Sequence, residues 1–202
     1  MPSEYDPWFP DGAEVEDDLE PIRDRFRAAS GPYLRSPWSW LAWAVVLPVA
    51  AMETPAAARL GGPAAVLVTW SVAILLGGAV EIAAILRMGG RAGGRAERTP
   101  LAAFVLRIQG NLSLAALVLS VLLVWQDLPW ALPGLWLLLL GHSFYLLGGL
   151  AFAPMRTCGL IFQLGGLAAF WPGWSPLAVF ALATAAGNLW MAFRVWRSRR
   201  ER

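Results

Sequence analysis

Apolar residues occur along this chain in long, nearly uninterrupted stretches. Six such segments follow one another after residue 36, separated by short polar connections. Most of them approach the roughly 20 residues that a helix needs to cross a bilayer. The pattern predicts an all-α, polytopic transmembrane bundle with helices over 38–57, 63–86, 101–125, 130–153, 157–171 and 175–196.

The fifth of these segments, residues 157–171, is the shortest. A span of about 17 residues is near the lower limit for crossing the hydrocarbon core. Two interpretations remain open: the segment crosses where the bilayer is thin, or it is re-entrant. Pro154 and Arg156 lie in the short connection before it and predict a tight turn there.

The arginines predict the orientation of the helices. If the N-terminus is cytoplasmic, that side holds Arg156 and all the arginines within 23–35, 87–98 and 194–202, whereas the opposite side holds only Arg59. Such a bias follows the positive-inside rule. Tryptophans also gather near both predicted membrane surfaces, as in interfacial aromatic belts. The sequence therefore predicts six transmembrane helices with both termini in the cytoplasm.

Residues 1–35 form a polar cytoplasmic arm before the transmembrane domain (36–197) and a short basic tail (198–202). Within residues 13–29 of the arm, apolar residues recur at spacings of four, three and four, which predicts a short amphipathic helix. Pro21 either opens this helix or breaks it. The apolar stripe suits the membrane surface, another membrane subunit, or the cytoplasmic face of the bundle itself.

Composition agrees with a membrane protein. Apolar residues make up 57% of the 202 residues and charged residues 15%, below the roughly 25% of soluble domains. The mean hydropathy is +0.53. The bilayer is thus the expected main partner, and the arginines alone do not indicate nucleic-acid binding.

Small residues at four-residue spacings predict close helix contacts. Ala73, Gly77 and Glu81 follow this spacing. A second series at the same spacing consists of Gly141, Tyr145, Gly149 and Ala153. Helices in lipid associate through such positions because small side chains let backbones approach.

Polar residues inside the predicted helices form a candidate site. Glu81 lies roughly 9 Å from the cytoplasmic edge and Arg107 roughly 11 Å, at 1.5 Å per helical residue. If their helices are antiparallel neighbours, the two side chains form a buried ion pair. One interpretation is an inward-facing ligand site, and the other is polar contacts that fix helix register. The remaining members of the predicted layer are Asn111, Gln163 and Asn188.

His142 is the single histidine, and Tyr145 shares its helix face. One histidine is too few for a bis-histidine haem or a histidine-based zinc site. A one-sided ligand to a single pigment or haem remains as one interpretation, and a hydrogen-bonded histidine in the core is the other. No metal site is predicted.

Part of the chain resembles a family of uncharacterised bacterial membrane proteins with six transmembrane helices. The residues that carry the resemblance are the run Pro133-Gly134-Leu135-Trp136-Leu137-Leu138-Leu139, then Pro154-Met155-Arg156, Gly159, and Gly165-Gly166. The resemblance spans about 132–190. It implies a multi-pass protein of the bacterial inner membrane with a charged N-terminal arm, and it brings no activity with it.

The expected function is that of an accessory or structural subunit of a larger membrane complex. The sequence has no Gly-x-Ser-x-Gly nucleophile elbow and no phosphate-binding loop, so an enzyme is the least favoured class. The alternative is a small transporter or substrate-binding membrane component that uses the inward-facing polar layer.

Overall fold

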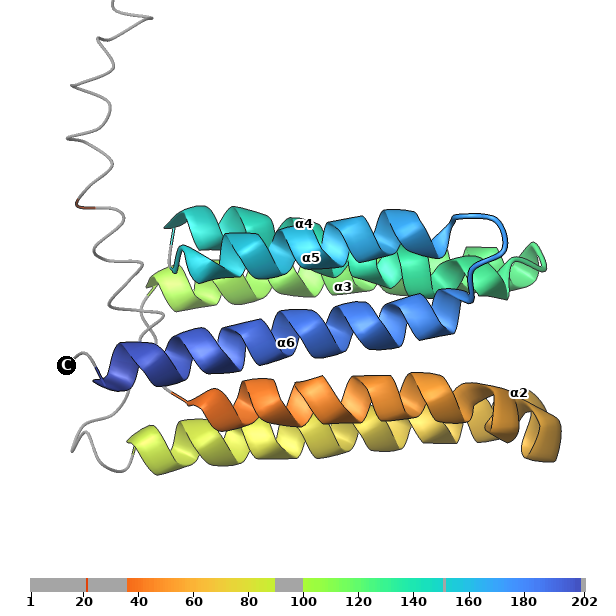
Figure 1. The fold of residues 1–202 in the computed structure, drawn as a ribbon, viewed down its shortest axis with the longest axis horizontal. Helices are drawn as coiled ribbons and strands as arrows, with labels where there is room; N and C mark the ends of the chain where they lie inside the picture. The colour runs from red at the N-terminus through yellow and green to blue at the C-terminus, as the bar shows by residue number, and fades with distance from the viewer. Residues whose placement is uncertain (1–20, 22–35, 90–99, 151, 201–202) are drawn as a thin grey trace, which may run out of the picture.

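The computed structural model describes residue 21 and residues 36–89, 100–150 and 152–200 (Figure 1). Apart from Pro21, the predicted helix within 13–29 lies outside the described part, as do residues 90–99, 151, 201 and 202. Within it, the chain is helical, without strands. The elements are α2 (Pro37–Gly89), α3 (Pro100–Trp125), the 3₁₀ helix η2 (Pro129–Ala131), α4 (Leu132–Leu150), α5 (Pro154–Ala169) and α6 (Pro176–Arg200).

Helix α2 reverses direction at Gly61 and Gly62, so it consists of two arms, 37–60 and 63–89. Gly62 has φ 61° and ψ −153°, a backbone conformation that is essentially restricted to glycine. The indole of Trp43 near the start of the first arm donates to Glu81 near the end of the second. The arms are therefore antiparallel and lie side by side, as the orange and yellow ribbons of Figure 1 show.

Chain reversals alternate between the two ends of the molecule. The reversal within α2, the 3₁₀ helix η2 and the α5–α6 connection lie at one end, and the α4–α5 connection and the C-terminus lie at the other (Figure 1). Asp127 before η2 and Gly173 before α6 both have positive φ, 56° and 85°. This alternation is the arrangement that an up-and-down bundle requires.

The core lies where α5 and α6 meet α4 and the first arm of α2. Among its fully buried side chains are Phe162 and Cys158 of α5, Leu137 of α4 and Met191 of α6. A Cβ atom added at Gly187 of α6 would collide with the Phe162 ring. The absence of a side chain there lets α6 approach α5, as helices in lipid commonly do through small residues.

Glycines also bring α4 and α5 together. A Cβ atom on Gly159 would lie 2.5 Å from the Tyr145 nitrogen and 2.6 Å from the Gly141 carbonyl oxygen. In α2, a Cβ atom on Gly77 would enter the Trp43 ring. The close contacts expected at Gly77 and Gly141 from their spacing are thus confirmed.

Three stretches of the described residues are long and apolar enough to cross a membrane: Pro37–Ala84, Pro129–Gly149 and Pro176–Arg200. Gly110–Trp125 of α3 is a shorter apolar stretch. The large apolar side chains exposed on α3 and the second arm of α2 include Leu67, Leu75, Ile82, Leu114, Leu117, Val121 and Trp125. This surface suits a helical membrane protein, since soluble monomers rarely expose apolar patches of such extent.

Substituting Gly159 tests the α4–α5 contact. Gly159→Ala is expected to lower the free energy of unfolding by about 1–3 kcal/mol, because its Cβ atom meets backbone atoms that move only with their helix. Gly78→Ala is the matched control, since a Cβ atom there has nothing within 4 Å. Equilibrium unfolding of both variants in detergent measures the difference, and equal stabilities would contradict the proposed close packing.

Candidate functional site

The polar residues predicted to form one layer lie in different surroundings. Asn188 of α6 is buried, and its side-chain amide donates to the Thr184 carbonyl at 2.7 Å. The buried Thr184 hydroxyl in turn donates to the Phe180 carbonyl at 2.7 Å. Each side chain therefore has a hydrogen-bond partner in the backbone of its own helix, which offsets part of the cost of burying it.

Glu81 is half-buried and interacts within the α2 hairpin. The Trp43 indole Nε1 donates to its Oε2 atom at 3.3 Å. Gly77, one turn before Glu81, provides the space for the Trp43 ring. The acid at this depth thus contributes to holding the two arms of α2 together.

The expected ion pair between Glu81 and Arg107 is not formed among the described residues. Helix α3 makes its extensive contacts with α4 and η2, whereas those of α2 are with α6, so α3 does not pack closely along α2. Arg107 is exposed on α3, and Asn111, one turn further along, is exposed as well. The structure therefore separates the acid from the base that the sequence interpretation had joined.

Gln163 lies apart from both groups. It is half-buried on α5, and its backbone and side chain lie against Gly141 of α4. The five predicted members are thus divided among the α2 hairpin, the exposed face of α3, the α4–α5 contact and the interior of α6.

The candidate ligand pair on α4, His142 and Tyr145, is exposed, and 41% of the Tyr145 surface is accessible. Phe144 between them faces inward and packs on Trp40 and Phe162. A pigment or haem bound at His142 would therefore lie on the outer surface of this chain. Within the described residues, no group of three or more His, Cys, Asp or Glu side chains is placed to hold a metal ion.

Two tryptophan–hydroxyl contacts recur in the bundle and were missed in the sequence. The Trp70 indole donates to the Thr54 hydroxyl, and the Trp136 indole donates to the Ser120 hydroxyl, each at 3.1 Å. Both hydroxyls donate to a carbonyl one turn back in their own helix, and each lies 16 residues before its tryptophan. The signal in the sequence is a Ser or Thr 16 residues before a Trp. It occurs once in the α2 hairpin and once across α3 and α4.

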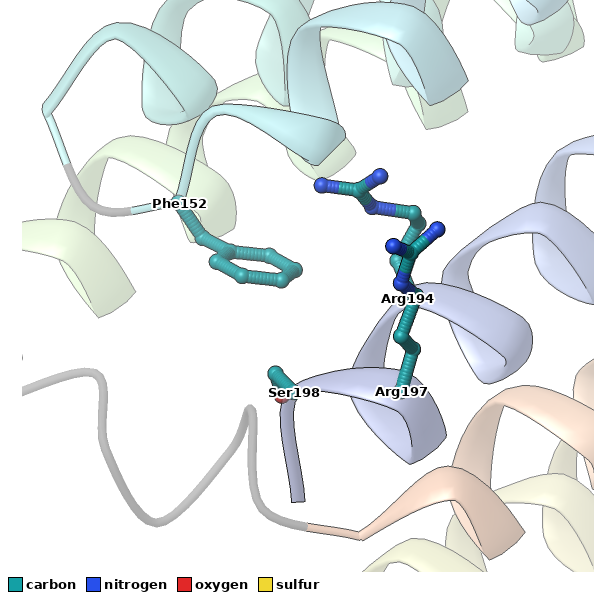
Figure 2. Close-up of a pocket in the computed structure, with 4 residues that line it drawn as sticks. All are labelled: Phe152, Arg194, Arg197 and Ser198. Carbon is teal, nitrogen blue, oxygen red and sulfur yellow. The ribbon is translucent and has the colours of Figure 1, made fainter. Parts of the chain in front are cut away.

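A basic cavity of about 240 Å³ lies at the end of the molecule where α6 terminates. It is lined by Arg194, Arg197 and Ser198 of α6 and by Phe152 from the α4–α5 connection. Figure 2 shows both arginine side chains extending from α6 and the Phe152 ring facing them across the space. The sequence indicated a basic end here but not a cavity, because Phe152 belongs to a different part of the chain.

Comparisons with known proteins return no match: no family model, curated protein or solved structure is similar to this chain at a significant level.

Double-mutant cycles test how the polar residues are grouped. Trp43→Phe and Glu81→Leu are expected to be non-additive by about 0.5–1.5 kcal/mol in the free energy of unfolding, because the first removes the donor and the second the acceptor of the same hydrogen bond. Glu81→Gln and Arg107→Gln should be additive within about 0.5 kcal/mol. Equilibrium unfolding in detergent measures both cycles. Strong coupling in the second cycle would indicate that Glu81 and Arg107 do form an ion pair.

Proposed function

We propose that this chain is an integral membrane protein that serves as an accessory or structural subunit of a larger membrane complex. One observation carries the proposal: Asn111 is exposed on α3, among exposed apolar side chains and roughly 16 Å along the helix from Pro100. Polar groups at such depth rarely face lipid, because lipid offers them no hydrogen-bond partner. A neighbouring subunit with a polar side chain at the same level supplies one.

The surroundings of Asn111 support the same conclusion. Arg107 lies one turn earlier on the same face and is also exposed, although a chain as long as arginine can reach the membrane surface. The opposite face of α3 packs on α4 through the buried Ala116 and the Ser120–Trp136 contact. Helix α3 therefore has one face inside the bundle and an outer face, with its polar residues, for a partner helix.

The proposed topology has six crossings with both termini in the cytoplasm of a bacterial cell. Each arm of α2 makes one crossing in this proposal, and α3 to α6 make the other four. The alternation of chain reversals between the two ends supports an even number of crossings (Figure 1). Arg194, Arg197, Arg199 and Arg200 lie at the proposed cytoplasmic end, in agreement with the positive-inside rule.

The alternative function, a small transporter with an inward-facing polar layer, has less support. It depended on polar residues from several helices meeting around one space. Glu81, Gln163 and Asn188 instead contact groups within their own hairpin, helix pair or helix.

Cysteine labelling tests the topology. Leu60→Cys and Gln126→Cys, exposed at the reversals, should react with a membrane-impermeant maleimide added outside spheroplasts, whereas Arg199→Cys should react only after permeabilisation. The native Cys158 is fully buried and should give little background. Labelling of Arg199→Cys in intact spheroplasts would contradict the proposed orientation.

Native mass spectrometry of the protein extracted mildly from its own membrane tests the accessory role. The expected species contains this chain with at least one other membrane subunit. Asn111→Leu should weaken that association on the order of 3- to 30-fold, the effect of one interhelical polar contact in lipid. Ser71→Leu, an exposed polar position on the second arm of α2, is the control and should leave the complex intact. A chain that is extracted without other subunits would overturn the proposal.

A further inference from the structure

The basic cavity is formed by parts of the chain that are distant in sequence. Arg194, Arg197 and Ser198 lie on one face of α6, and Phe152 reaches the same space from the connection before α5. The Ser198 hydroxyl donates to the Val195 carbonyl at 2.9 Å. Among the lining residues the two guanidinium groups are the charged ones, and Phe152 provides an apolar wall.

The position of Arg194 is set by contacts with its neighbours. Its guanidinium carbon lies 5.6 Å from the centroid of the Trp190 ring. The Trp190 indole donates in turn to the Pro154 carbonyl at 3.2 Å, which links α6 to the first residue of α5. A guanidinium that lies over a ring uses its face for that contact and keeps the N–H groups at its edge for an anion.

Helix electrostatics alone account for only part of this cluster. The last turn of a helix favours cations because its carbonyl groups carry partial negative charge, and Arg197, Arg199 and Arg200 lie in the last turn of α6. Arg194 precedes that turn, is half-buried and contributes to the cavity wall. Its placement between Trp190 and the cavity therefore calls for a second explanation.

We propose that this cavity binds the phosphate group of an anionic phospholipid. Two guanidinium groups match the geometry and charge of a phosphate, which accepts paired hydrogen bonds from the planar fork of arginine. Basic pockets between membrane helices at the cytoplasmic surface are suited to such lipids. The choice of a lipid over free phosphate rests on the membrane location proposed above.

Lipid titration of the purified chain in a neutral detergent tests the site. Phosphatidylglycerol and phosphatidylcholine with the same acyl chains are added separately, and bound lipid is counted by native mass spectrometry. Both lipids carry a phosphodiester, but the choline of phosphatidylcholine adds a positive charge that the two guanidinium groups repel. The first phosphatidylglycerol should therefore bind about tenfold more tightly than phosphatidylcholine. R194Q and R197Q should each remove most of this preference.

R200Q is the matched control. Arg200 lies over the Trp196 ring at 4.5 Å, on the same helix end, but it does not line the cavity. It removes the same charge and should leave the preference for phosphatidylglycerol unchanged. An equal loss in R200Q and R194Q would overturn the proposal, because binding would then follow net charge rather than the cavity.

Two further results separate the remaining explanations. If R194Q fails to fold, R194K keeps the charge without the planar fork, and the proposal requires a several-fold loss of phosphatidylglycerol affinity in that variant. Inorganic phosphate that displaces phosphatidylglycerol at equal concentration would overturn the lipid assignment. Because the titration uses the isolated chain in micelles, its failure would leave the accessory role and the topology untouched.

Discussion

The contact between Gly141 of α4 and Gly159 of α5 brings two helix backbones together, and the other helices are placed around that pair. In lipid, helices gain little from burying apolar side chains against each other, so close packing and polar contacts decide which helices associate. Helix α5, with only 16 residues, has one side on α4 and the other on α6. Gly187 likewise lets α6 approach α5, because its missing side chain leaves room for the Phe162 ring. The short fifth helix thus lies between α4 and α6 and joins them.

Away from the α4–α5 contact, hydrogen bonds from indole groups link neighbouring helices. The Trp43–Glu81 and Trp70–Thr54 bonds hold the two arms of α2, and the Trp136–Ser120 bond holds α3 to α4. An indole N–H has one donor and a large apolar ring, so it fills space and satisfies a polar group at the same time. This explains why several tryptophans contact residues between the helices, in addition to those that the sequence predicts near the two membrane surfaces.

Much of the helical pattern was predictable from the sequence, whereas helix pairing was not. Long apolar stretches and the glycines and prolines between them indicate where helices begin and end, and the residues around Gly61 and Pro63 indicated the reversal in α2. Which helices touch depends on side-chain fit across the bundle. The assumption that consecutive helices are neighbours joined Glu81 to Arg107, but α3 packs on α4 and α2 on α6. The basic cavity escaped prediction for the same reason, since Phe152 and Arg194 meet only after folding.

The reversal at Gly62 has a consequence for how the chain is made. Only two glycines separate the arms of α2, so no hydrophilic loop of any length has to be carried across the bilayer between them. In the proposed topology the two arms therefore cross the bilayer as one helical hairpin, and the ionisable side chains that lie toward its outer end are Glu53 and Arg59.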